Sequence, residues 1–208
     1  MFYIKCISFG VLVFCSTLAK AQSSYFNSIG IEHSYEPIVH DFEEDTEVSE
    51  DSVDTTGTIP QALVDATCVA FPLEKLHLTS PFGVRRDPLK SGKAKMHSGL
   101  DLRARFVPVS SMLPGTVVDV GYSKTGGNYV SISHGVCLCS YLHMSKISVK
   151  EGSHVSAGDI VGISGNSGSR TTGPHLHISC RYLDKDGSKG KYFNPMLLLE
   201  FVSNMTKK

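Results

Sequence analysis

The chain has 208 residues, of which 41% are hydrophobic, and its 20 basic residues balance its 20 acidic residues. This length supports one folded domain around one hydrophobic core and leaves too little chain for a second. We therefore expect one domain with appendages, and no nucleic-acid partner.

Residues 1–21 have the pattern of a secretory signal peptide. Lys5 supplies the positive charge, residues 7–18 form an apolar run, and Ala19-Lys20-Ala21 is a small-x-small cleavage site. The run is short for a bilayer, and no later run approaches the roughly twenty residues of a transmembrane helix. We expect export, cleavage at this site, and no membrane span in the mature chain. Cys15 raises the alternative that the chain is a lipoprotein. The bulky Phe14 disfavours it, because a lipobox has a small residue before the cysteine.

Residues 22–65 differ from the rest of the chain in charge. They carry eleven acidic residues and no Lys or Arg, whereas residues 66–208 carry eighteen basic and nine acidic residues. High charge with low hydrophobicity predicts disorder in the acidic segment. Two interpretations stay open. In the first, the segment is a solvated spacer. In the second, it folds back over the basic domain and shields the functional site, with an acidic residue, His33 or His40 occupying the open position of a bound metal ion.

The domain at 66–208 has the pattern of β-structure. Short β-branched runs punctuated by glycine predict strands at 116–120, 129–133, 136–142 and 160–164. Turn signals separate them, such as Pro114-Gly115 and Gly126-Gly127. No segment shows a sustained 3.6-residue apolar period. We therefore expect an all-β fold of antiparallel sheets joined by loops.

Three short stretches carry closely spaced histidines: His97-Ser98-Gly99-Leu100-Asp101, Tyr141-Leu142-His143 and Gly173-Pro174-His175-Leu176-His177. If the first is extended, His97 and Asp101 share a strand face, with Gly99 leaving room between them for an ion. The same parity places His175 and His177 together, and the preceding proline suits the start of a strand.

These residues outnumber the ligands of one metal. A catalytic zinc takes three His or carboxylate ligands and leaves a fourth position for water, whereas a structural zinc takes four protein ligands. The surplus therefore indicates catalysis. Each residue alone has a simpler interpretation: Asp101 could pair with Arg103 or Arg105, and His143 could be a satisfied buried histidine.

The order of these motifs resembles the LytM/lysostaphin-like zinc endopeptidases, peptidase family M23. The resemblance covers about residues 71–195 and includes three further motifs: Ser80-Pro81-Phe82-Gly83-x-Arg85, the Gly-x-x-Val-x-x-Gly-Asp pattern at 152–159, and Gly165-Asn166-Ser167-Gly168. It implies antiparallel sheets that form a groove with the zinc site on its floor.

The resemblance also implies the site residues. His97, Asp101 and His177 would bind one Zn²⁺, which lowers the pKa of a bound water toward about 7 and polarises the scissile carbonyl. His143 and His175 would be the catalytic histidines, dividing proton transfer and oxyanion stabilisation in a way that the sequence does not decide.

One departure from the family pattern concerns the residues after His177. The family often has an aromatic residue and then Glu there, whereas this chain has Ile178 and Ser179. The group that holds the other ring nitrogen of His177 must then come from elsewhere.

Three further residues are candidate substrate contacts: Arg85, Tyr141 and Asn166. Arg85 suits a substrate carboxylate or an acid that holds a loop. Tyr141 suits the cleft or the core, and Asn166 is more typical of a turn. Loops at 88–95, 123–127 and 164–172 would shape substrate choice.

Four cysteines follow the signal peptide: Cys68, Cys137, Cys139 and Cys180. They allow three complete pairings, among which the sequence does not choose. Cys137 and Cys139 share the strand face that leads by parity to His143, so a thiolate zinc site is one alternative. Buried thiols or a disulfide are simpler.

The resemblance and the signal peptide together imply a secreted zinc metalloendopeptidase that cuts peptide cross-links of peptidoglycan, in the periplasm or envelope of a Gram-negative bacterium. The basic domain suits this anionic polymer. The alternative is a noncatalytic relative that binds the wall or activates another wall hydrolase, which the complete ligand set disfavours. Residues 149–160 also resemble a lipoyl-carrier hairpin, but no lysine signal at a compatible tip follows.

Overall fold

The computed structural model describes residues 68–87 and 94–206. The predicted signal peptide and acidic segment lie outside the described residues. In chain order the elements are β1 (Leu78–Ser80), β2 (Gly83–Arg86), β3 (Ala94–His97), β4 (Gly99–Arg103), β5 (Pro108–Ser110), β6 (Gly115–Ser123), β7 (Gly127–Ser133), β8 (Cys137–Met144), β9 (Lys146–Ile147), β10 (His154–Val155), β11 (Ile160–Ile163), β12 (His175–Leu183), β13 (Lys189–Phe193) and α3 (Met196–Thr206).

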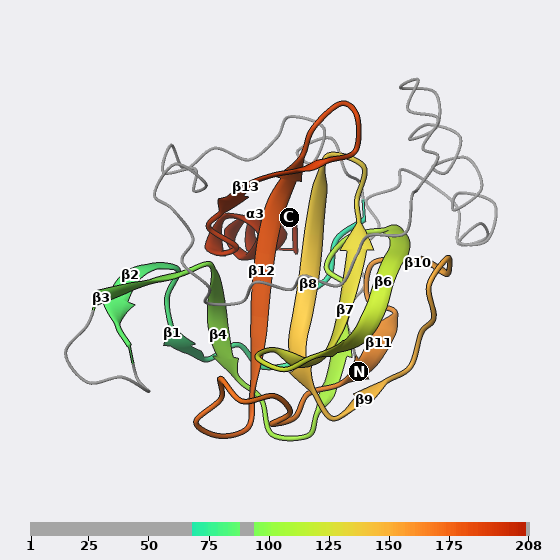
Figure 1. Ribbon diagram of the computed structural model, residues 1–208. Coiled ribbons are helices and arrows are strands. Elements are labelled where there is room, and N and C mark those ends of the chain that lie inside the picture. The colour runs from blue at the N-terminus through green and yellow to red at the C-terminus, as the bar shows by residue number, and fades with distance from the viewer. Residues whose placement is uncertain (1–67, 88–93, 207–208) are drawn as a thin grey trace.

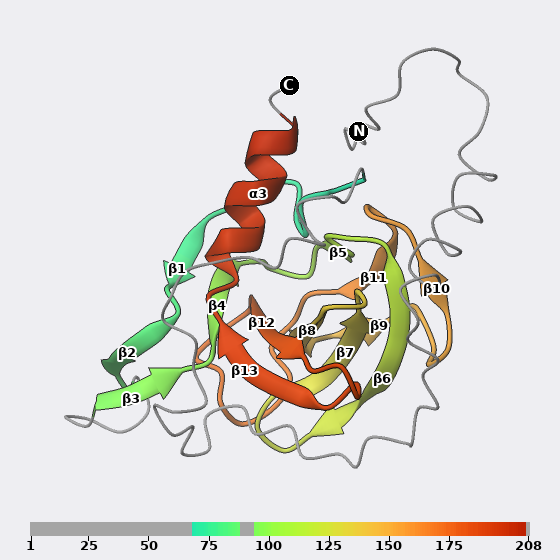
Figure 2. The same ribbon diagram turned by 90° about the horizontal axis from the view of Figure 1, so that it is seen from above.

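An eight-stranded antiparallel sheet forms the body of the molecule (Figure 1). Its strand order is β1-β4-β12-β8-β7-β6-β10, with β13 paired to β12. The three-stranded sheet β5-β11-β9 packs against it near β6 and β7 (Figure 2), and β2-β3 forms a separate two-stranded ribbon. The four predicted strands overlap β6, β7, β8 and β11, with ends that differ by up to three residues. The expected all-β class with antiparallel sheets is confirmed.

The large sheet has one face toward the core, and the central strands alternate accordingly. On β4, Leu100 and Leu102 are fully buried, while Asp101 and Arg103 lie on the opposite face and are more exposed. On strand β12 the residues of the hydrophobic core are Leu176, Ile178 and Cys180, and the polar residues between them, His177 and Ser179, are buried as well. Apolar side chains on one face therefore fix which polar side chains share the other.

The helix α3 at the C-terminal end was not expected from the sequence. Asn194 caps it, since its Oδ1 accepts the Met196 N–H at 3.0 Å, and Pro195 suits the first turn. The helix packs on the core through Leu198, Leu199, Phe201 and Val202. Its first half is apolar on nearly every side, which hides the 3.6-residue period.

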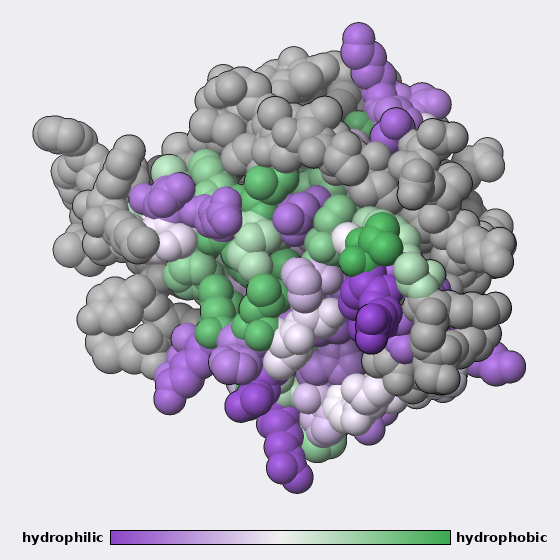
Figure 3. All heavy atoms as spheres, turned by 90° about the vertical axis from the view of Figure 1, so that its left-hand side faces the viewer, coloured by the Kyte–Doolittle hydropathy of each residue, from purple (hydrophilic) through white to green (hydrophobic). Residues whose placement is uncertain are grey.

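The side of the molecule that carries β2 and β3 shows apolar and hydrophilic side chains next to one another (Figure 3). Among its exposed apolar residues are Leu78 on β1 and Val84 on β2. Within the described part of the chain, the structure contains no helix that is long and apolar enough to cross a membrane.

Three cysteine thiols lie in the core, away from the histidines. Cys139 and Cys180 are register partners on β8 and β12, with their Sγ atoms 3.3 Å apart, and Cys137 lies beside them. Burial raises the pKa of the Cys180 thiol, and the hydrogen bond with Cys139 together with burial raises the pKa of Cys137. These thiols favour the protonated form, so the structure gives no support to a thiolate zinc site.

His134 is a buried histidine in the β7–β8 turn. Its Nδ1 lies 2.9 Å from the Pro114 carbonyl oxygen, and among the described residues its Nε2 has no hydrogen-bond partner. Burial lowers its pKa from 6.5 to about 4. His134 therefore has a structural position.

We expect His134 to make folding pH-dependent. The unfolded chain binds this proton near pH 6.5 and the folded chain only near pH 4, so stability present above pH 6.5 is lost as pH falls toward 4. Over this range the free energy of unfolding falls by about 3 kcal/mol. His134→Asn keeps a donor for the Pro114 carbonyl and does not titrate.

Urea unfolding of wild type and His134→Asn at pH 7.5 and 4.5 checks this expectation. The variant should lose clearly less free energy of unfolding between the two pH values than wild type does. Equal losses in the two proteins would contradict the role assigned to His134.

Candidate functional site

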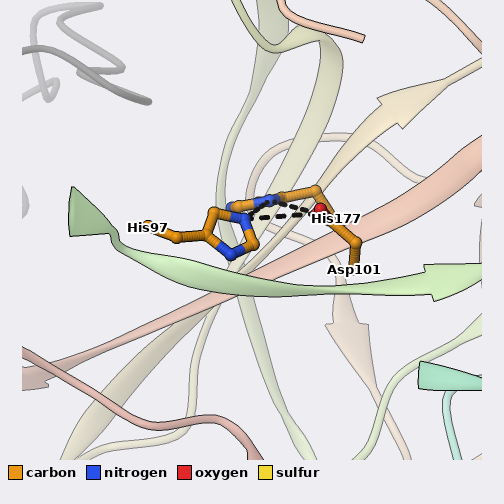
Figure 4. Close-up of side chains that lie close together, drawn as sticks. All are labelled: His97, Asp101 and His177. Carbon is orange, nitrogen blue, oxygen red and sulfur yellow. Dashed lines mark hydrogen bonds and ion pairs between the residues drawn. The ribbon is translucent and has the colours of Figure 1, made fainter. Parts of the chain in front are cut away.

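The pairing of β4 with β12 brings the predicted metal ligands together. Asp101 and His177 are register partners on these strands, although 76 positions separate them in the sequence. His97 ends β3, and Ser98 separates it from β4. The stretch from His97 to Asp101 is therefore not one continuous strand, but its two side chains still converge with His177 (Figure 4).

The three side chains bring one donor atom each to a common point. His177 Nδ1 lies 2.9 Å from Asp101 Oδ1, His97 Nε2 lies 3.1 Å from His177 Nδ1, and His97 Nε2 lies 3.3 Å from Asp101 Oδ1. Metal–ligand bonds of 2.0–2.1 Å in a tetrahedron separate ligand atoms by about 3.3 Å. The donor set and its spacing fit one zinc ion with a fourth position left open.

The backbone orients the two ligand rings. His97 Nδ1 lies 2.8 Å from the Pro81 carbonyl oxygen, so this nitrogen carries the proton and Nε2 keeps its lone pair for the cluster. His177 turns Nδ1 to the cluster, and its Nε2 edge lies over Gly99. A Cβ at Gly99 would overlap this ring and the Ile178 carbonyl oxygen. The space that Gly99 leaves is thus taken by a ligand ring rather than by the ion itself.

Asp101 is held in its ionised form. Burial opposes the charge, but the adjacent rings of His177 and His97 outweigh burial and hold the pKa of the carboxyl well below its usual range. The other carboxylate oxygen lies 3.7 Å from the Arg85 guanidinium. Arg85 therefore contacts an acid of this chain, which was one of its two predicted roles.

His175 lies next to the ligand set. Its Nε2 is 3.5 Å from Asp101 Oδ1, and its Nδ1 is 2.8 Å from the Gly173 carbonyl oxygen. This contact assigns the ring proton to Nδ1 and leaves Nε2 as an acceptor. Burial is the largest influence on the ring and lowers the pKa of His175 despite the charge of Asp101. The neutral ring can accept a proton.

His143 reaches the same cavity through an irregularity of β8. By strict alternation it would share the core face of Cys139 and Tyr141. The pairing with β7 shifts by one residue between Tyr141 and Met144, and His143 adopts a positive φ of 59°. A bulge of this kind re-aims side chains. The His143 ring consequently lies 4.6 Å from the His175 ring, centroid to centroid.

Two loops hold His143 in this conformation. Its N–H donates to the Gly126 carbonyl oxygen at 2.8 Å, and its Nδ1 lies 2.7 Å from the Ser167 carbonyl oxygen. The Ser167 hydroxyl donates to the Met144 carbonyl at 2.8 Å and accepts the Asn128 N–H at 2.9 Å. The loops at 123–127 and 164–172, which the sequence assigned to substrate choice, thus also position a candidate catalytic ring.

An open cavity of about 360 Å³ lies over these groups. All five predicted zinc and catalytic residues line it, and so does Arg85. Tyr141 does not: it is fully buried, and its hydroxyl accepts the Met112 N–H at 3.0 Å. Asn166 is exposed and accepts the Thr171 hydroxyl at 2.6 Å in its turn. Of the three candidate substrate contacts, the structure brings only Arg85 to the cavity.

Sequence reasoning missed three residues of this site. Arg103 and Arg170 line the cavity, and Ser167 supports His143. Arg103 left a signal because it lies two positions after Asp101 and shares its strand face, and Ser167 belongs to the Gly165-Asn166-Ser167-Gly168 motif. The position of Arg170 and the contact of Ser167 with His143 depend on loop geometry that the residue pattern does not encode.

Comparison with known proteins identifies the family. The sequence model of peptidase family M23 matches residues 95–195. The solved catalytic domain of lysostaphin from Staphylococcus simulans is 30% identical, with a TM-score of 0.50, and the match covers 60% of this chain and 92% of that domain. The chain belongs to peptidase family M23. The solved structure of LytU is likewise 30% identical, at a TM-score of 0.52, covering 61% of this chain and 86% of that one.

A curated M23 relative gives the same result in sequence. The peptidoglycan DD-endopeptidase ShyA of Vibrio cholerae serotype O1 is 41% identical over 110 residues, which are 51% of this chain and 25% of that protein. The chain thus spans about a quarter of this relative's length.

We expect Gly99→Ala to weaken metal binding in this M23 site. The added Cβ overlaps the His177 ring and the Ile178 carbonyl, so the ring must move from its place among the ligands. Disturbing the support of a ligand typically lowers metal affinity by about 10- to 100-fold. Zinc titration against a competing chelator measures this change.

Gly190→Ala is the matched control, since the nearest atom to its added Cβ is the Tyr182 carbonyl oxygen at 3.3 Å on a strand away from the site. Zinc affinity should be unchanged in this variant. Equal affinities in both variants would contradict the proposed placement of His177.

We expect Ser167→Ala to lower peptidase turnover without lowering zinc affinity. The variant loses the hydroxyl bonds to Met144 and Asn128, which loosens the carbonyl that orients His143. A loss of roughly 10-fold in kcat is expected for a supporting residue of this kind. Ser169→Ala, exposed in the same loop, is the control. A parallel loss of zinc would show that Ser167 supports the whole site rather than His143.

Proposed function

We propose that the chain is a zinc metalloendopeptidase that hydrolyses peptide cross-links of bacterial peptidoglycan. One observation carries the proposal: two histidine rings, His143 and His175, lie beside a His-Asp-His set of candidate ligands in one open cavity. The printed name of the relative ShyA, a peptidoglycan DD-endopeptidase, supports the substrate class.

Zinc bound by His97, Asp101 and His177 would supply a Lewis acid that polarises the scissile carbonyl and makes a water acidic. The rest of the chemistry belongs to the chain. His143 and His175 each direct Nδ1 at a backbone carbonyl, which fixes the tautomer and leaves Nε2 as the acceptor. One ring can take the proton of the attacking water, and the protonated ring can return it to the leaving amine.

The position of His175 favours it as the group nearest the reacting atoms. Its Nε2 is 3.5 Å from Asp101 Oδ1, a candidate ligand atom, and the His143 ring lies beside the His175 ring at a centroid separation of 4.6 Å. In the same cavity, the second ring can stabilise the developing oxyanion by donating a hydrogen bond from Nε2 when both of its ring nitrogens carry protons. We assign proton transfer to His175 and this second role to His143.

The proposal extends to cellular location and domain limits. The signal-peptide pattern at 1–21 supports export to the periplasm or envelope, and the relative from Vibrio cholerae supports a Gram-negative setting. Residues 66–208 would form the peptidase domain, with 22–65 as an acidic tether or pro-segment. The excess of basic residues in the domain suits an anionic wall polymer.

Digestion of purified peptidoglycan tests the function. The zinc-loaded protein should release new amino termini, and a chelator should abolish the release. His97→Ala should lose zinc and activity together, because it removes a ligand. His143→Ala should keep zinc and lose about 100-fold or more in turnover, because it removes a group that acts on the reacting atoms. Mass spectrometry of the released peptides and zinc analysis provide the readouts.

His154→Ala serves as the control, since this histidine is exposed on β10 and lies outside the cavity. It should retain zinc and turnover. A zinc-loaded wild type that cuts no wall type would favour the noncatalytic alternative, in which the domain binds the wall or activates another hydrolase. Full activity of His143→Ala would refute the role assigned to His143 and leave the proposed peptidase function intact.

A further inference from the structure

Three arginines line the cavity, and two of them are committed to acids of this chain. The Arg85 guanidinium lies 3.7 Å from Asp101 Oδ2, and the Arg170 guanidinium lies 3.2 Å from Asp87 Oδ1. Arg103 also lines the cavity, but it forms no ion pair with any acid in residues 68–87 and 94–206. The pairing of Asp101 with Arg103, one of the simpler interpretations of the sequence, is not formed, because Arg85 takes that oxygen.

The strands place Arg103 beside the reacting groups. It follows Asp101 by two residues on β4, which sets it on the same face about 7 Å along the strand. Its register partner on β12 is His175. Directly opposed residues of antiparallel strands have Cα atoms about 4.5–5.5 Å apart. A long, exposed side chain at this position can reach a substrate group one residue away from the bond that is cut.

The chemistry of Arg103 selects a particular kind of group. A guanidinium presents a planar fork of donors that matches a carboxylate with two parallel hydrogen bonds. A peptide cross-link whose amine-donating residue carries a free carboxylate near that amine presents this anion close to the bond that joins the two stems. A glycine bridge has no free carboxylate at the corresponding place.

We propose that Arg103 binds the free carboxylate of the residue whose amine is released, and so selects carboxylate-bearing cross-links over neutral glycine bridges. The inference rests on the proposed function, because it names the substrate class of the same site. It gives Arg103 a substrate-binding role, and it leaves Arg85 and Arg170 as residues that hold the cavity walls.

Two synthetic peptides test this assignment on the zinc-loaded, full-length protein. Both contain the same side-chain amide link, and they differ only in whether the amine-donating residue carries a carboxylate or a carboxamide. Wild type should prefer the carboxylate peptide by about 10- to 100-fold in kcat/KM, the range expected for a charge-assisted pair. In Arg103→Gln the ratio should fall to about one. Arg103→Lys, which keeps the charge without the fork, should retain part of the preference.

Arg105→Gln is the matched control. Arg105 is exposed two residues further along, does not line the cavity, and loses the same charge on substitution. Its preference should equal that of wild type. The ratio of the kcat/KM values that one protein shows for the two peptides does not depend on the fraction of that protein that is active. If Arg103→Gln turns over too slowly, dissociation constants of both intact peptides in a His143→Ala background give the same comparison.

The outcomes separate the two claims. A wild type that cleaves both peptides equally well, or an Arg103→Gln protein that keeps the preference, would overturn the role of Arg103 and leave the proposed function intact. A wild type that cleaves neither peptide and no peptidoglycan would overturn the proposed function itself. A preference that falls equally in Arg103→Gln and Arg105→Gln would assign selection to net charge and overturn the specific contact.

Discussion

The site depends on the antiparallel pairing of β4 with β12. This ladder places Asp101 opposite His177 and Arg103 opposite His175, so four side chains that line the cavity are fixed by one register. The opposite faces of the same strands carry Leu102 and other core residues. A slip of one residue would exchange the two faces and bury the polar groups. Packing in the core and alignment of the site are therefore the same constraint.

His143 follows a different rule. It lies on a strand whose alternation would turn it inward, and a bulge with a left-handed residue brings it to the cavity. Left-handed backbone costs a non-glycine residue about 1–2 kcal/mol. The carbonyl groups of Gly126 and Ser167 hold the residue there. The fold thus places the ligands through regular pairing and one of the two additional histidines through a defined irregularity.

These two modes explain how much the sequence could predict. Alternation correctly associated His175 with His177, and β-branched runs located the main strands, because both depend on a local period. Alternation failed for His143, since a bulge is set by long-range pairing and by loops that close over it. The C-terminal helix was not predicted because its first half is apolar on nearly every side, which hides the 3.6-residue period. Arg85 stayed ambiguous because its partner, Asp101, lies on another strand, and only the fold brings the two together.

The support of His143 has a consequence for how such an enzyme can diversify. The loops at 123–127 and 164–172 border the cavity, where insertions and substitutions would most readily create new substrate preferences. Two of their carbonyl oxygens, however, hold His143: that of Gly126 accepts its backbone N–H, and that of Ser167 contacts its ring Nδ1. A loop of new sequence keeps His143 in position only if it places a backbone carbonyl oxygen where that of Gly126 or Ser167 now lies. Substitutions that alter specificity are therefore better tolerated at side chains on regular strands, such as β4. A substitution there leaves the two carbonyl groups that hold His143 in place.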